Sequence, residues 1–120
     1  MFKIILYTSN KKKHAKELLH LVDSKHYMYH MFFKKSMVLI DNRRLKNLRI
    51  AERDLSKVLA IDYTDESYLH KENCIILKPF KGYDAKDSNL KELLSYFQTR
   101  VNLEDEELDL RHLAKEFPKQ

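Results

Sequence analysis

Glycine, proline and cysteine are scarce in this chain of 120 residues, which has one Gly, two Pro and one Cys. With a single glycine the sequence has no GxGxxG fingerprint and no Walker motif, so glycine-rich phosphate loops are excluded. The lone Cys74 excludes an internal disulfide, and its apolar neighbours predict a buried, inert thiol. No apolar run reaches the roughly 18 residues of a membrane span, and the first residues resemble neither a signal peptide nor a transit peptide.

Charge is distributed unevenly along a chain that is long enough for one domain with a real core. Residues 1–60 carry 14 Lys and Arg against 5 Asp and Glu, whereas residues 61–120 carry 9 against 13. This asymmetry indicates a polar partner without identifying it. Basic clusters at 11–13 and 43–44 suit phosphates, but no aromatic-interleaved RNA signature accompanies them. A solvated helix start and a charged turn are the better interpretation, and no nucleic-acid partner is expected.

The stretch from Arg53 to Asp62 begins with a mainly polar segment, continues with a short aliphatic run and ends in a single carboxylate. Such a run, here Val58–Ile61, predicts a strand buried on both faces of a parallel sheet. An acidic residue at its carboxyl end lies where open α/β sheets bind ligands. The alternative, which spacing alone favours, is that Asp62 only caps the next turn. Buried strands are also expected at Ile4–Tyr7 and Ile75–Leu77.

The first strand, 2–7, is followed by Thr8-Ser9-Asn10, where Ser9 or Asn10 is expected to cap a helix. Apolar side chains recur at helical spacing in that helix, at Ala15, Leu18, Leu19 and Val22. Hydroxyls at the end of a strand can donate to an oxyanion, although simple capping explains them equally well. The aromatic and Met-rich stretch 27–33 is explained by core packing. His30 lies within this stretch and His26 just before it, and no carboxylate or Cys accompanies them to complete a zinc site.

A β-hairpin is predicted in the middle of the chain. The segments 37–40 and 44–48 flank the turn-forming cluster at 41–43. Because its tip is expected to be exposed, the hairpin is a candidate contact arm for a partner protein. The residues assigned to it are Val38, Leu39, Ile40, Asp41, Asn42, Arg43, Arg44 and Leu45.

The C-terminal part predicts two helices. Asp87 or Ser88 caps the first, whose apolar residues are Leu90, Leu93, Leu94 and Phe97. An acidic segment, 103–117, forms the second, with its carboxylates favourably near the helix N-terminus. We therefore expect one domain over residues 1–100 and an acidic helical tail over 101–120.

In this order, the segments resemble the NLI-interacting-factor-like phosphatase domain of the haloacid-dehalogenase-like superfamily, from about Lys3 to Arg100. The likeness is carried by Leu6-Tyr7-Thr8-Ser9-Asn10, the hairpin, Arg53–Val58, Ile61-Asp62, Glu72–Ile76 and Pro79–Gly82. The Ser-Asn pair and the loop after Asp62 are most similar to the receptor-subunit branch, which serves the mitochondrial presequence translocase. The resemblance implies an α/β fold: a three-layer sandwich with a mainly parallel sheet and an inserted β-hairpin.

The resemblance also implies a set of phosphate-site positions. In active phosphatases of this domain an Asp-x-Asp motif on an earlier strand supplies nucleophile and general acid. Thr8, with Ser9 beside it, matches the group that holds the phosphoryl oxygens, and Lys46 matches the lysine that neutralises them. Asp62 matches the first of two magnesium carboxylates, and Tyr63 stands in place of the second.

The chain contains no Asp-x-Asp, so the N-terminal catalytic strand is expected to be missing from it. Without the nucleophilic Asp an aspartyl-phosphate intermediate cannot form, and the loss of one carboxylate weakens magnesium binding. We expect no catalysis and no cofactor, with magnesium relevant only to a longer form that restores the motif.

The expected function is that of a receptor-type, non-enzymatic subunit of the mitochondrial or mitosomal inner-membrane translocase, facing the intermembrane space. The hairpin would contact the channel subunit, and Asp62, Asp65 and Glu66 would bind basic presequences. The basic first half of the chain fits that role poorly. The alternatives are a protein serine/threonine phosphatase of the C-terminal-domain type, inactive in this chain, and nucleic-acid binding, which charge alone suggests.

Overall fold

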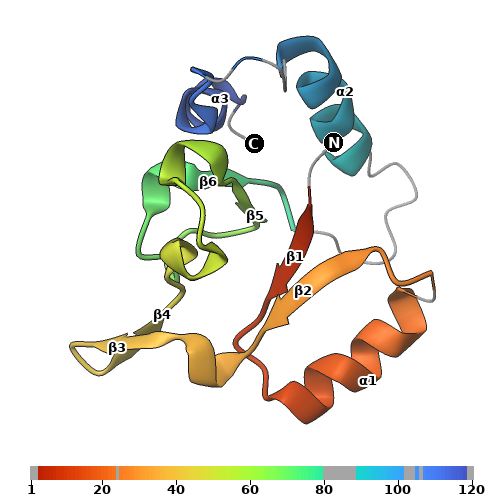
Figure 1. Ribbon diagram of the computed structural model, residues 1–120, viewed down its shortest axis with the longest axis vertical. Coiled ribbons are helices and arrows are strands. Elements are labelled where there is room, and N and C mark those ends of the chain that lie inside the picture. The colour runs from red at the N-terminus through yellow and green to blue at the C-terminus, as the bar shows by residue number, and fades with distance from the viewer. Residues whose placement is uncertain (1–2, 24, 80–88, 102–104, 106, 119–120) are drawn as a thin grey trace. The chain divides into compact units, whose positions relative to one another are not determined.

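The computed structural model describes residues 3–23, 25–79, 89–101, 105 and 107–118 (Figure 1). The chain divides into two compact units, Met1–Asn47 and Leu48–Gln120, and each is described by itself. Both units combine helices with a pair of parallel strands, so the chain has the mixed α/β content that the sequence predicts.

A β-α-β arrangement forms most of the first unit. Strand β1 (Ile4–Tyr7) pairs in parallel with β2 (Met28–Phe32), and helix α1 (Lys12–Val22) connects them. The register shifts between Ile4 and Ile5, which produces a local irregularity in the pair. Parallel strands need such a crossover, because a tight turn can only join antiparallel neighbours.

Several predictions about this unit are wrong in detail. The residue at the N-cap of α1 is Lys11, without a side-chain cap, rather than Ser9 or Asn10. Leu18 and Ile4 are exposed, so the buried stripe of α1 is narrower than its spacing suggests and β1 is only partly buried. Aromatic residues of the 27–33 stretch are also exposed, at Tyr27 and Tyr29, because β2 belongs to a two-stranded sheet.

An antiparallel hairpin is present where the turn cluster predicts one. Strands β3 (Val38–Ile40) and β4 (Arg43–Leu45) pair with Leu39 opposite Arg44 and Ile40 opposite Arg43. The connecting residues, Asp41 and Asn42, both have positive φ, 50° and 62°. Two left-handed residues define a type I′ turn, and Asn and Asp tolerate this region better than other non-glycine residues. The chain thus makes the turn without glycine.

In the second unit, one strand of the parallel pair is buried on both faces, but the other exposes Ile61, so the prediction of a strand at Val58–Ile61 buried on both faces is wrong. Strand β5 (Ala60–Asp62) pairs with β6 (Cys74–Ile76), and β6 continues into Leu77, whose N–H donates to the Asp62 carbonyl at 2.8 Å. One cluster of buried residues is Leu48, Ala60, Tyr68 and Cys74, and the other is Ile75, Leu77, Leu93 and Phe117. Alternate residues of β6 thus enter opposite clusters, as a strand period of two requires. Cys74 is buried, as the sequence predicts.

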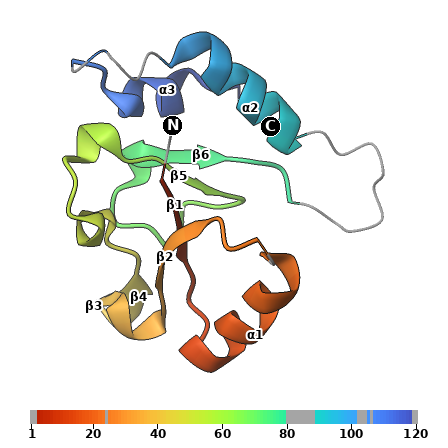
Figure 2. The ribbon, with the colours of Figure 1, turned by 45° about the vertical axis from the view of Figure 1, so that its right-hand side comes forward.

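Two helices complete the second unit (Figure 2). Helix α2 (Asn89–Arg100) and α3 (Leu110–Glu116) are joined by a hydrogen bond from the Tyr96 hydroxyl to the Leu113 carbonyl, at 3.0 Å. The Tyr96 ring also meets the Phe117 ring edge-on. Asp87 and Ser88, the predicted caps of α2, lie outside the described residues, and Leu90 and Leu94 are exposed. Helix α3 is shorter than the predicted 103–117 because Asp109 caps it.

Four short 3-10 helices connect these elements: η1 (Lys34–Ser36), η2 (Leu48–Ala51), η3 (Leu55–Lys57) and η4 (Lys71–Asn73). The predicted strand Val58–Ile61 is shifted, since Val58 caps η3 and the strand itself begins at Ala60. The predicted strand Ile75–Leu77 begins one residue earlier, at Cys74.

Candidate phosphate-site positions and contact surfaces

Thr8 and Ser9 follow directly after β1 in the first unit. The backbone N–H of Thr8 donates to the Phe32 carbonyl at 3.1 Å, so Thr8 continues the parallel pair by one residue. Its Oγ1 accepts the backbone N–H of Asn10 at 3.1 Å, which tightens the turn into α1. Thr8 therefore tightens the turn before α1 without capping the helix, while Ser9 is exposed.

Ser9 lines an open basic cavity of about 420 Å³ at the carboxyl end of β1. The other lining residues are Asn10, Lys11, His14, Leu18 and Lys34. Hydroxyl, amide and ammonium donors with no carboxylate in the lining give this cavity the chemistry of an anion site. The end of β1 is thus suited to a phosphate or carboxylate group, although the cavity is open to solvent.

Lys46 is buried, with 7% of its surface exposed, immediately after β4. Its Nζ lies 5.9 Å from the centroid of the Tyr7 ring. The Tyr7 hydroxyl donates to the Ser36 carbonyl at 3.0 Å and accepts the backbone N–H of Asn47 at 3.4 Å. Burial raises the pKa of Tyr7, and the hydrogen bond from Asn47 partly opposes this. Tyr7 thus joins the β1 end that carries Thr8 to the segment that carries Lys46.

Asp62 ends β5 in the second unit, and its carboxylate is engaged by the loop that follows. Oδ1 accepts the backbone N–H of Tyr63 at 2.7 Å, and Oδ2 accepts the hydroxyl of Tyr68 at 2.9 Å. Tyr68 is buried, while the side chain of Tyr63 is exposed. These hydrogen bonds agree with the alternative that Asp62 caps the turn that follows β5. Tyr68 was not predicted from the sequence, although an aromatic residue in an otherwise polar loop is a recognisable signal.

The other two acidic positions lie in the same loop. The carbonyl of Asp65 accepts the Tyr68 N–H at 3.0 Å, and the Glu66 N–H donates to Oγ1 of Thr64 at 3.3 Å. Glu66 is exposed and Asp65 is half-buried. In the described part of the chain, no three His, Cys, Asp or Glu side chains are grouped so that they could hold a metal ion.

The hairpin presents apolar and cationic groups together. Leu39 is 62% exposed and Ile40 is 42% exposed, and β4 exposes Arg43 and Arg44 at the paired positions. Exposed aliphatic residues beside arginine are typical of protein contact surfaces. Thr8, Ser9, Lys46 and the hairpin belong to the first unit, whereas Asp62, Asp65 and Glu66 belong to the second. Among the described helices, none combines the length and apolar content needed to cross a membrane.

Comparison with known proteins matches residues 1–109 to the family model of the NLI interacting factor-like phosphatases. The chain is similar to the mitochondrial import inner membrane translocase subunit TIM50 of Kluyveromyces lactis, with 32% identity over 119 residues, which is 98% of this chain and 24% of that protein. It is similar to CTD small phosphatase-like protein 2 of Dictyostelium discoideum, with 27% identity over 88% of this chain and 18% of that protein.

A third relative is CTD small phosphatase-like protein 3 of Caenorhabditis elegans, which is 30% identical over 81% of this chain. The chain spans 34% of the length of that relative. In all three cases it therefore matches a minor part of the curated protein, and both translocase subunits and phosphatases are among its relatives.

Proposed function

Because the chain belongs to the NLI interacting factor-like phosphatase family, we propose that it serves as a receptor-type subunit of an inner-membrane protein import translocase. The observation that carries this proposal is the 32% identity to a translocase subunit over 98% of the chain. The proposed location is the mitochondrion, or a reduced relative such as a mitosome, on the side of the inner membrane that faces the intermembrane space. The proposed fold is the three-layer haloacid-dehalogenase-like sandwich with an inserted hairpin.

The hairpin is the proposed contact with the channel subunit of the translocase. Its exposed Leu39 and Ile40 offer apolar area, and the arginines opposite them offer charge. The type I′ turn holds the two short strands in a fixed register, which lowers the entropy lost on binding. These features support a protein contact better than they support a catalytic role.

The loop after β5 is the proposed contact for presequences, which are basic amphipathic helices. Since the Asp62 carboxylate already accepts hydrogen bonds from Tyr63 and Tyr68, we assign it to holding the loop in shape. Asp65 and Glu66 then supply the negative charge, and Tyr63 supplies exposed aromatic surface beside it. Charge complementarity of this kind contributes mainly to specificity and association rate.

The chain is proposed to have no phosphatase activity of its own. Its sequence has no Asp-x-Asp, and Tyr63 stands where the family pattern has a second magnesium carboxylate. The alternative is a serine/threonine phosphatase of the C-terminal-domain type, which the phosphatase relatives and the Thr8, Ser9 and Lys46 positions favour. Magnesium would be relevant only to that alternative.

Binding by variants of the purified chain tests the receptor proposal. Leu39→Asp should weaken binding to the soluble domain of the channel subunit by about tenfold or more, because it places a charge in apolar contact area. The matched control is Leu21→Asp, since Leu21 is 79% exposed on α1, outside the hairpin. Equal loss in both variants, or no loss in either, would contradict the hairpin assignment.

A second measurement separates the receptor from the phosphatase. The chain should bind a presequence peptide better than a peptide of equal charge whose apolar residues are scrambled, and Asp65→Asn with Glu66→Gln should weaken the binding of both peptides. It should not hydrolyse p-nitrophenyl phosphate with Mg²⁺. Turnover that disappears in Asp62→Asn would favour the phosphatase instead.

A further inference from the structure

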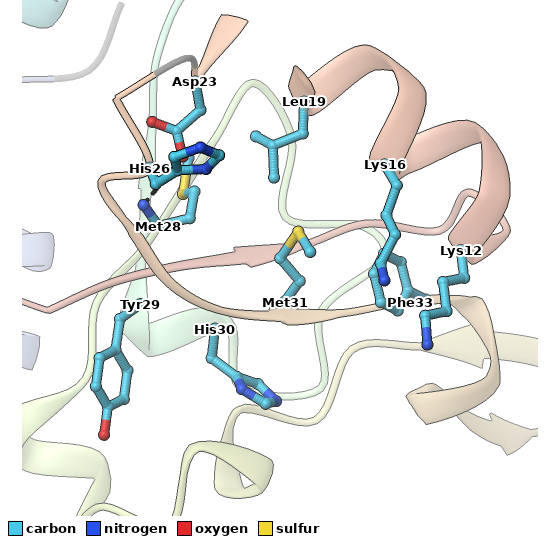
Figure 3. Close-up of a pocket in the computed structure, with 10 residues that line it drawn as sticks. All are labelled: Lys12, Lys16, Leu19, Asp23, His26, Met28, Tyr29, His30, Met31 and Phe33. Atoms are coloured by element: carbon cyan, nitrogen blue, oxygen red, sulfur yellow. Dashed lines mark hydrogen bonds between the residues drawn. The ribbon is translucent and has the colours of Figure 1, made fainter. Parts of the chain in front are cut away.

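The first unit contains a second open groove, between α1 and β2, of about 380 Å³. Figure 3 shows Leu19 of α1 and Met31 of β2 pointing toward one another across it. Met28 and Phe33 add to the apolar lining. Neither the hairpin nor the loop after β5 lines this groove, so the groove lies outside both contacts of the proposed function.

Cationic side chains border the groove on the α1 side. Lys12 and Lys16 extend from successive turns of α1 toward β2, above Met31 and Phe33 (Figure 3). Both lysines are exposed, and their i, i+4 spacing places them on one face of the helix. The groove therefore combines an apolar floor with two ammonium groups at its rim.

The single carboxylate in the lining is committed to the turn between α1 and β2. Asp23 accepts the backbone N–H of Tyr27 on Oδ1 at 2.8 Å and that of Met28 on Oδ2 at 3.1 Å. These bonds accompany the left-handed conformation of His26, whose φ is 57°. Asp23 thus fixes the turn that forms the end of the groove, with both oxygens already accepting hydrogen bonds.

The residues around the groove are mostly basic, so their charge has the same sign as that of Lys12 and Lys16. Residues 1–47 contain 11 Lys and Arg and 3 Asp and Glu, and of the three acids Asp23 alone lines the groove. Tyr29 and His30 of β2 also line the groove (Figure 3), and Lys3 Nζ lies 4.4 Å from the centroid of the Tyr29 ring. The field over this unit therefore favours an anionic partner.

We propose that the α1–β2 groove binds an acidic peptide segment that carries apolar side chains. The apolar groups would cover Leu19 and Met31, and the carboxylates would pair with Lys12 and Lys16. A basic presequence is disfavoured at this place by like charge, so this site and the presequence site of the proposed function select opposite partners. Nucleic acid is the alternative occupant, because exposed Tyr29 and His30 in the lining offer rings for base stacking, and the test below separates it from the peptide.

Three labelled synthetic peptides and the full chain test the proposal by fluorescence anisotropy. The first peptide has 14 residues with Leu or Phe at helical spacing and Asp or Glu elsewhere. The second keeps the apolar positions and has Lys elsewhere, and the third keeps the acids and has Ser at the apolar positions. Only the first should bind well, by about tenfold or more over the others, and added salt should weaken it.

Two double variants with equal net charge locate the site. Lys12→Glu with Lys16→Glu should reduce binding of the first peptide by about tenfold or more. Lys13→Glu with Lys25→Glu changes the net charge equally at exposed positions outside the groove and should bind like the parent chain.

Equal losses in the two double variants would overturn the proposal, because net charge alone would then explain binding. Equal binding of the first and third peptides would overturn it as well, since the apolar floor would have no part. Displacement of the first peptide by a single-stranded RNA of equal charge, with tighter binding of the RNA, would assign the groove to nucleic acid instead. The proposal does not depend on the receptor function, which the hairpin variants test separately.

Discussion

At the residue scale, the most consequential polar group in the second unit is one that looks ordinary in the sequence. Asn73 is fully buried, and its Nδ2 donates to the carbonyls of Leu55 and Val58 at 2.6 and 2.9 Å. These two carbonyls belong to the first residue of η3 and to its C-cap, just before β5 begins. One amide group therefore fixes the path of the chain into β5, while its Oδ1 is buried without a hydrogen-bond partner.

Asn73→Ala should lower the free energy of unfolding by about 2–4 kcal/mol, because it leaves two carbonyls without their donor in a buried site. Urea denaturation followed by far-ultraviolet circular dichroism measures this change. The control is Asn10→Ala, an exposed asparagine, which should stay within about 0.5 kcal/mol of the parent. A loss below that limit in Asn73→Ala would show that water replaces the amide.

At the element scale, local patterns predicted which elements exist better than where they begin and end. The hairpin and the buried strand near Ile75 follow from turn chemistry and aliphatic runs, and both are present. The cap of α1 was predicted wrongly because Thr8 uses its hydroxyl one turn earlier and leaves Lys11 at the N-cap. Spacing also could not show that Leu18 is exposed, since that depends on how much surface the partner strands cover.

The candidate site shows the same division. The residue types at Thr8, Lys46 and Asp62 could be assigned from motif order, but their hydrogen bonds could not. Tyr7 and Tyr68 make the contacts that organise these positions. Tyr7 acts across 40 residues of sequence, which no local pattern reports, whereas Tyr68 lies six residues from Asp62 in the same loop. Whether these residues form one working site stays a prediction.

The start of α3 gives a prediction for pH. Asp109 caps the helix and forms a bidentate pair with Arg111, at 2.7 and 2.9 Å, and this pairing lowers the pKa of Asp109 to about 2. A lowered pKa in the folded state stabilises the fold above the ordinary value of 3.8, and this contribution is lost as pH falls toward about 2.

Asp109→Asn keeps a capping acceptor but removes the charge, so its melting temperature should lie below that of the parent above roughly pH 4 and approach it near pH 2. Thermal melts across this range measure the difference. Arg111→Gln should reproduce the pattern, because it removes the partner of the same pair. A constant difference at every pH would instead indicate that packing, not charge, is lost.

At the scale of the whole molecule, buried apolar residues are concentrated in the second unit. Ten of the thirteen buried hydrophobic residues among those described lie beyond Asn47, and they form clusters on both faces of β6. The first unit buries three, Ala15, Phe33 and Met37, and its hairpin has both strands largely exposed. The two units should therefore differ in local stability.

Hydrogen exchange measured by mass spectrometry should reveal this difference in the full chain. Amides of β6 and Leu77 should exchange about two orders of magnitude or more slowly than those of the hairpin at the same pH and temperature. The α1 amides serve as an internal reference, since they are helical but belong to the first unit. Hairpin amides as protected as those of β6 would contradict this assignment of the stable core.

Four of the described residues have a left-handed backbone conformation, and this restricts the substitutions that the protein tolerates there. They are His26, Asp41, Asn42 and Glu52, with φ between 50° and 62°, and all four are exposed. A surface position normally accepts most residues, but a left-handed backbone penalises β-branched side chains whatever they contact. In a map of mutational tolerance these four positions would be restricted despite their exposure, with valine and isoleucine rejected and glycine accepted. Anyone who reads such a map as a guide to binding surfaces would then mistake backbone geometry for partner contact.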